Sequence, residues 1–137
     1  MNRPAGLLGI ASAFPEQRID RAGTLDALTR LFPREQPAFL AGMIERSGVR
    51  ERALALPLEQ TLAPRDFSAR NREYATIALE LAVRAARSVL ERCGVAASEV
   101  SAVIDVSCTG LLIPALDAAL VERLELSPFV RDRKSVV

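Results

Sequence analysis

Apolar residues recur every three or four positions along one long stretch, and this spacing predicts a helix from about Asp66 or Ser68 to Cys93. Gly94 supplies the end of this helix, because glycine readily adopts the left-handed conformation that terminates many helices. The apolar positions on the shared face are Tyr74, Ile77, Ala78, Leu81, Ala82, Ala85, Val89 and Cys93. The alanines among them favour close packing against another helix or a sheet.

Shorter elements are predicted on both sides of this helix, and strand and helix alternate along the chain without an internal repeat or a domain boundary. The predicted helices are Thr24–Leu31, a helix that Pro37 opens and Gly48 ends, and Ile113–Leu124 with Pro114 in its first turn. The predicted extended segments are Leu7–Ala13, Val49–Leu56 and Ala102–Val106, with Leu58–Pro64 irregular and Ala97–Val100 a connector. This alternation predicts an α/β fold.

The strand Ala102–Val106 ends in four small residues, Ser107 to Gly110. Sites in open α/β sheets form just beyond the carboxyl ends of strands, so Cys108 and Thr109 stand where a ligand or chemistry is expected. Cys108 could be a nucleophile, or it could line a pocket or pack in the core. A thiolate nucleophile normally has a histidine or a comparable base beside it, and the chain contains no histidine. The absence of histidine favours lining or packing.

Composition excludes several classes of partner. The 18 basic residues nearly balance the 17 acidic ones, which gives no indication of binding to nucleic acid or a membrane surface. The two cysteines form no disulfide framework, which fits a reducing cytoplasm, and neither metal-ligand spacing nor a phosphate-binding loop is present. A charged cluster could bind an anionic ligand or could be a solvated helix end. Its members are Glu45, Arg46, Arg50, Glu51 and Arg52.

Five segments occur in an order that resembles the start of a type III polyketide synthase, the chalcone/stilbene-synthase-like branch of the thiolase superfamily. They are GIASAFP, MIERSGVRER (Met43 to Arg52), RDFSARNREY, the VSCTG segment that reaches Asp117, and LVERLELSPFVR. The resemblance covers about Gly6 to Arg131. A 3-oxoacyl-[acyl-carrier-protein] synthase III shares the ERSGVRER-like element, and the Cys-Thr-Gly with the Pro114 to Asp117 spacing favours the polyketide synthase.

The resemblance implies an incomplete N-terminal part of a thiolase-like fold, a layered α/β/α arrangement with a mixed sheet. It implies an acyltransferase that condenses an acyl-CoA starter with malonyl-CoA by decarboxylation, works as a cytoplasmic homodimer and needs no cofactor besides these substrates. By position in the family, Cys108 and Thr109 line the acyl cavity, Ile113 reaches into the partner's cavity, and Arg46 contacts coenzyme A. Two further basic positions of the family are Phe39 and Gly42 here, so that part of the coenzyme A contact does not carry over.

The family's catalytic cysteine, histidine and asparagine follow the SPFVR segment, so we expect no catalytic residue in this chain and no activity from it alone. Cys108 precedes the family's nucleophile by one strand. Residues 1–131 are interpreted as a truncated synthase segment and residues 132–137, DRKSVV, as a non-native tail. A common sequencing adapter contains the codons GAT CGG AAG AGC GTC GTG, which encode DRKSVV. The next codon in that adapter is the stop codon TAG. The alternative to a non-native tail is a natural polar tail. The alternative to a truncated synthase is a half-subunit that another chain completes.

Overall fold

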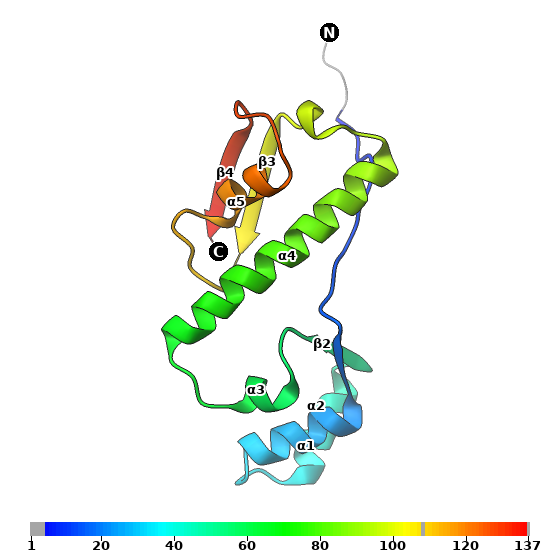
Figure 1. The fold of residues 1–137 in the computed structure, drawn as a ribbon. Coiled ribbons are helices and arrows are strands. Elements are labelled where there is room, and N and C mark those ends of the chain that lie inside the picture. The colour runs from blue at the N-terminus through cyan, green and yellow to red at the C-terminus, as the bar shows by residue number, and fades with distance from the viewer. Residues whose placement is uncertain (1–4, 108, 137) are drawn as a thin grey trace. The chain divides into compact units, whose positions relative to one another are not determined.

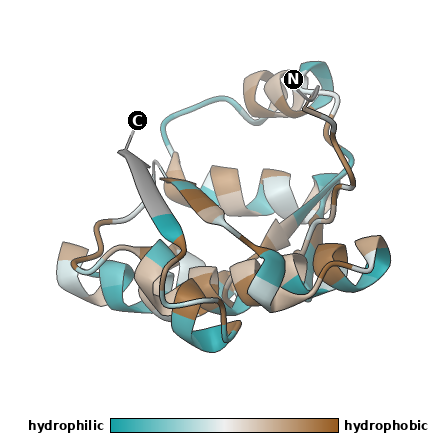
Figure 2. Ribbon diagram, turned by 90° about the horizontal axis from the view of Figure 1, so that it is seen from above, coloured by the Kyte–Doolittle hydropathy of each residue, from teal (hydrophilic) through white to brown (hydrophobic). Residues whose placement is uncertain are grey.

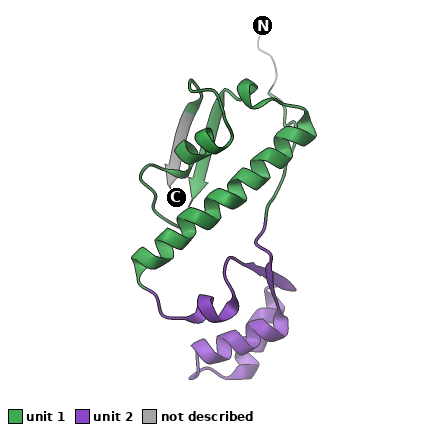
Figure 3. Cartoon of the chain, in the orientation of Figure 1, with its two compact units in different colours: residues 1–13, 66–137 green, residues 14–65 purple. Residues whose placement is uncertain are grey.

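The computed structural model describes residues 5–107 and 109–136, with side chains through residue 131. These residues form two compact units (Figures 1 and 3). One unit is Phe14–Arg65, and the other joins the N-terminal segment up to Ala13 with the chain from Asp66 onward.

The unit Phe14–Arg65 combines a two-stranded antiparallel ladder with three helices. Its elements are β1 (Gln17–Asp20), α1 (Arg21–Leu31), α2 (Pro37–Arg46), β2 (Glu51–Leu54) and α3 (Leu58–Leu62). The ladder places Ile19 opposite Arg52. The buried side chains are Ala27 of α1 and Leu40 and Ile44 of α2, so the core of this unit lies between these two helices.

Local capping sets the helix ends in this unit. α1 begins at Arg21, three residues before the predicted start at Thr24, because the Asp20 carboxylate accepts a hydrogen bond from the Gly23 N–H at 2.8 Å. α2 opens at Pro37 as predicted and ends at Arg46, and Gly48 follows with a left-handed φ of 70°. The predicted irregular segment Leu58–Pro64 contains the short helix α3, so that prediction was wrong.

The long helix α4 (Phe67–Cys93) confirms the apolar periodicity (Figure 1). Asp66 caps its N-terminus by accepting a hydrogen bond from the Ala69 N–H at 2.6 Å, and Gly94 ends it with a φ of 63°. Both ends lie where the sequence places them.

A parallel strand pair and a short helix lie beside α4. The elements that follow α4 are the 3₁₀ helix η1 (Ala97–Glu99), β3 (Ala102–Ser107), α5 (Leu116–Arg123) and β4 (Arg131–Val136). α5 contacts α4 and both strands, and Val83 of α4 forms the core with Leu116 and Leu120 of α5. α5 begins three residues later than predicted, because Ala115 takes the extended N-cap conformation and leaves Pro114 in the preceding loop.

β4 pairs with β3 from Ala102 opposite Arg131 to Ser107 opposite Val136. It contains residues 132–136, which the sequence predicts to be a non-native tail. A parallel ladder uses only backbone N–H and C=O groups, so this pairing is compatible with either origin of these residues.

The predicted strand Leu7–Ala13 is wrong. This segment carries no strand in the structure and instead contacts the C-terminal end of α4. Arg92 donates a hydrogen bond from Nη1 to the Ile10 carbonyl at 3.2 Å, and a Cβ at Gly9 would lie 2.4 Å from the Cys93 Sγ. The glycine therefore lets the segment approach Cys93, a half-buried free thiol.

Candidate functional site

The site predicted beyond the carboxyl end of β3 is a loop between Ser107 and α5. Cys108 lies outside the described residues. Thr109 is exposed, and its N–H donates to the Ser107 Oγ at 3.4 Å. The loop therefore folds back on the last residue of β3, and Thr109 stands at the surface.

Two side chains of α4 hold this loop. The Asn71 amide makes two hydrogen bonds with one loop residue: its Nδ2 donates to the Leu111 carbonyl at 2.7 Å, and its Oδ1 accepts from the Leu111 N–H at 2.9 Å. The Tyr74 hydroxyl hydrogen-bonds the Ser107 Oγ at 2.5 Å. Asn71 and Tyr74 are three residues apart, so they share one face of the helix.

Gly110 lies directly against the Tyr74 ring. A Cβ at Gly110 would lie 2.1 Å from the Tyr74 Cδ1 and 2.6 Å from its Cγ, closer than any carbon contact permits. The requirement for glycine here is therefore steric, because the ring occupies the space of a side chain.

The two residues before Pro114 point to different environments. Leu112 packs against the core cluster of α4 and α5, whereas Ile113 is 96% exposed. An apolar side chain this exposed at a predicted interface position is compatible with contact to a second copy of the chain.

Arg46 lies in the last turn of α2, within the unit Phe14–Arg65, and is exposed. Its guanidinium folds back over its own helix, since a Cβ at Gly42 would lie 3.0 Å from the Arg46 Nη1. In the surrounding charged cluster, Glu51 forms a salt bridge with Arg18 at 3.8 Å. These are exposed charges, each of which contributes little to stability.

Two carboxylates lie where the predicted strand and the last predicted helix meet. Asp117 in the first turn of α5 is fully buried; its Oδ1 accepts from the Ala118 N–H at 2.8 Å, and its Oδ2 has no partner among the described residues. Asp105 of β3 is half-buried. Burial raises the pKa of the Asp105 carboxyl, and the nearby Asp117 charge raises it further.

The raised pKa of Asp105 predicts that Asp105→Asn stabilises the chain at neutral pH. Above its folded-state pKa this carboxyl disfavours folding, because the unfolded chain ionises it more easily; below its unfolded-state pKa the penalty disappears. Urea midpoints at several pH values are the measurement. We expect the advantage of the variant to shrink as the pH falls, while Glu122→Gln, which removes an exposed carboxylate on α5, changes the midpoint little. An advantage that does not depend on pH would contradict this account.

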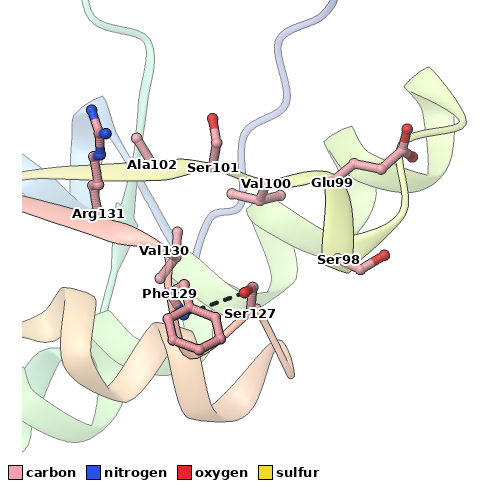
Figure 4. Close-up of a pocket in the computed structure, with 9 residues that line it drawn as sticks. All are labelled: Ser98, Glu99, Val100, Ser101, Ala102, Ser127, Phe129, Val130 and Arg131. Atoms are coloured by element: carbon pink, nitrogen blue, oxygen red, sulfur yellow. Dashed lines mark hydrogen bonds between the residues drawn. The ribbon is translucent and has the colours of Figure 1, made fainter.

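A surface hollow of about 550 Å³ lies at the opposite end of the strand pair (Figure 4). It is lined by residues from η1 and from the starts of β3 and β4, and the Phe129 N–H donates to the Ser127 Oγ within it at 3.3 Å. Ligands of parallel sheets bind at the carboxyl ends of the strands, which argues against this hollow as the substrate site. Of the predicted site residues that the structure describes, Arg46, Thr109 and Ile113, none lines it.

Sequence reasoning missed Asn71 and Tyr74 as loop-holding residues. Tyr74 was assigned to the apolar face, and its hydroxyl partner was not predicted. The sequence did contain a signal for Asn71, because asparagine is unfavourable inside a helix. Asn71 also lies three residues before Tyr74, a position on the apolar face. Asp105 is likewise an unexpected residue type for its place, because it is a carboxylate inside the otherwise apolar predicted strand Ala102–Val106.

The described part of the chain contains neither a cluster of metal-binding side chains nor a membrane-spanning helix. Within residues 5–107 and 109–131, no three or more histidine, cysteine, aspartate or glutamate side chains are grouped so that they could hold a metal ion. No helix in these same ranges has both the length and the apolar character needed to cross a membrane.

The chain is similar in sequence to known bacterial synthases. It is 29% identical over 133 residues to the 1,3,6,8-tetrahydroxynaphthalene synthase of Streptomyces peucetius subsp. caesius, covering 96% of this chain and 35% of that protein. It is 33% identical over 114 residues to the phloroglucinol synthase of Pseudomonas fluorescens Pf-5, covering 82% of this chain and 33% of that protein. No family model matches the chain.

The fold is also similar to a solved structure. The crystal structure of the 1,3,6,8-tetrahydroxynaphthalene synthase of Streptomyces coelicolor A3(2), a bacterial type III polyketide synthase, matches 92% of this chain with a TM-score of 0.85 and 28% identity. The match covers 36% of that synthase. The chain thus spans about a third of the length of the curated relatives it matches.

Proposed function

We propose a function from one premise: this chain is homologous to the type III polyketide synthases over about a third of their length, and its fold is the corresponding mixed α/β segment of their thiolase-like structures. The proposal is that the chain is the N-terminal segment of an acyltransferase that condenses an acyl-CoA starter with malonyl-CoA. The observation that carries it is the structural match to the Streptomyces coelicolor synthase over nearly the whole chain.

The proposal assigns roles to four residues of this chain. Cys108 and Thr109 line the acyl cavity, and the position of Thr109 at the carboxyl end of β3 supports this role. Ile113 reaches across the interface of a homodimer, which its nearly complete exposure supports. Arg46 binds the phosphates of coenzyme A, with its exposed guanidinium as the contacting group.

The proposed chemistry requires residues that this chain lacks. Decarboxylative condensation here uses a cysteine that carries the acyl group, with a histidine and an asparagine that assist decarboxylation. The chain has no histidine, and we propose that these groups lie in a continuation of the reading frame. Residues 132–137 are then adapter sequence in place of that continuation, and the 137-residue chain has no condensing activity.

Sequencing the source DNA across the Arg131 codon tests the proposal. We expect a frame that continues into a strand, a cysteine followed by small residues, and later a histidine and an asparagine. The continued protein should then release CO₂ from malonyl-CoA in the presence of an acyl-CoA, while the 137-residue chain does not. A native DRKSVV followed by a stop codon would refute the proposal for this chain and favour a half-subunit that another polypeptide completes.

A further inference from the structure

We propose that Asn71 and Tyr74 are positioning residues: together they clamp the loop after β3 and set the directions in which Thr109 and Ile113 project. The role of the loop in an acyl cavity and a dimer interface rests on the function proposed above. The clamp itself rests on contacts within one compact unit of the chain.

The Asn71 side chain acts on the loop as a neighbouring strand would. One amide group satisfies both the N–H and the C=O of Leu111, at 2.9 and 2.7 Å. Leu111 lies outside any helix or strand, so its backbone has no ladder partner there. Aspartate at neutral pH has no donor for the carbonyl, and alanine has neither group. The arrangement is therefore specific to a side chain that both donates and accepts.

Tyr74 fixes the start of the same loop in two ways. Its hydroxyl bonds the Ser107 Oγ at 2.5 Å, and its ring lies against the Gly110 backbone. Ser107 also accepts from the Thr109 N–H, so the tyrosine holds the group on which Thr109 folds back. The hydrogen bond and the ring contact are separable, because phenylalanine keeps the ring and loses the hydroxyl.

The helix that carries the clamp is itself well anchored. Further along the same helix, Ala78, Leu79, Ala82 and Val83 pack against α5 in the core cluster. Leu112, the next loop residue after the clamped Leu111, also joins this cluster. With Ser107, Gly110, Leu111 and Leu112 all held, Ile113 projects outward from a fixed base rather than from a free loop.

Backbone hydrogen exchange of the 137-residue chain tests the clamp. Asn71→Ala should speed exchange of the Leu111 amide by about tenfold or more, because that N–H loses its acceptor and the carbonyl loses its donor. Amides around Val83 should keep their protection. Arg72→Ala, an exposed neighbour on the same turn, is the matched control and should leave Leu111 unchanged. Tyr74→Phe should loosen Ser107, Thr109 and Gly110 with a smaller effect on Leu111.

Asn71→Asp supplies a readout that a merely structural role would not give. A protonated carboxyl both donates and accepts as the amide does, whereas the carboxylate only accepts. At neutral pH the carboxylate can still accept from the Leu111 N–H, but it repels the Leu111 carbonyl oxygen and so weakens the clamp. Relative to wild type at each pH, this variant should lose part of the protection at Leu111 at neutral pH and regain it in acid.

Two results would overturn the clamp: unchanged Leu111 exchange in Asn71→Ala, or equal loss of protection at Leu111 and Val83. The proposed function is tested separately, by the DNA sequence beyond the Arg131 codon. It can therefore be refuted while the clamp is confirmed, and the reverse also holds.

Discussion

Gly110→Ala is expected to destabilise the chain by about 1–3 kcal/mol, the usual range for forcing an extra methyl group into a packed site. The new Cβ would lie 2.1 Å from the Tyr74 Cδ1, and the Tyr74 hydroxyl is bonded to Ser107. The ring therefore cannot move away without losing that hydrogen bond, so the loop or α4 must shift.

Urea unfolding followed by the circular dichroism of the helices, at low chain concentration, measures this cost. Gly6→Ala is the matched control, because apart from its two chain neighbours no described residue has a heavy atom within 4 Å of a Cβ added at Gly6. The double variant Tyr74→Ala, Gly110→Ala removes the obstructing ring, so the cost of the Gly110 change should fall in that background. Equal midpoints for Gly110→Ala and Gly6→Ala would show that the ring does not restrict this position.

Elements whose signals are local were predictable from the sequence. The long helix α4 was predicted with its ends, because apolar periodicity, an Asp66 cap and a Gly94 stop all agree. The strand β3 was predicted from its run of β-branched residues. The fold class was also correct, and the resemblance drawn from the order of several short segments is confirmed as homology to type III polyketide synthases over about a third of their length.

The errors occur where tertiary contacts override local pattern. Leu7–Ala13 has the composition of a strand, yet its backbone carries no ladder and instead lies near Arg92 and Cys93. The helix α5 begins at Leu116 and not at the predicted Ile113, because Ala115 has an extended backbone. The prediction relied on the preference of proline for the first helical turn, and Pro114 lies in the loop before the helix. The division into two units was not visible in composition, since no Gly- or Pro-rich linker marks it.

The role of the loop after β3 as a site stays a prediction, and the residues that hold this loop were not predicted. Position after β3 indicated Cys108 and Thr109 as candidates, because strand ends of this kind carry sites in many α/β folds. Ile113 became a candidate only through the family resemblance. The residues that hold the loop come from a helix more than thirty positions earlier in the chain. A pairing over that distance depends on how α4 packs beside β3, and one sequence without relatives contains no signal for such a contact.

β3 presents an apolar face that should make the chain self-associate. Its residues alternate: Val103, Asp105 and Ser107 are half-buried, whereas Ile104 and Val106 are 70% and 61% exposed. Figure 2 shows β3 largely in the hydrophobic colour beside the grey β4. In the proposed synthase this strand would belong to a sheet covered on both faces, which would bury Ile104 and Val106.

The double variant Ile104→Lys, Val106→Lys is therefore expected to weaken self-association by about a hundredfold or more. Burying each of these side chains in a contact between copies is worth roughly 1.5–3 kcal/mol, and lysine removes that gain and adds repulsion between like charges. Sedimentation velocity over a range of concentrations measures the change. Phe129→Lys is the control, because Phe129 is 90% exposed but lies outside β3. If the wild-type chain stays monomeric at tens of micromolar, or if Phe129→Lys has the same effect, the β3 face is not the surface through which the chains associate.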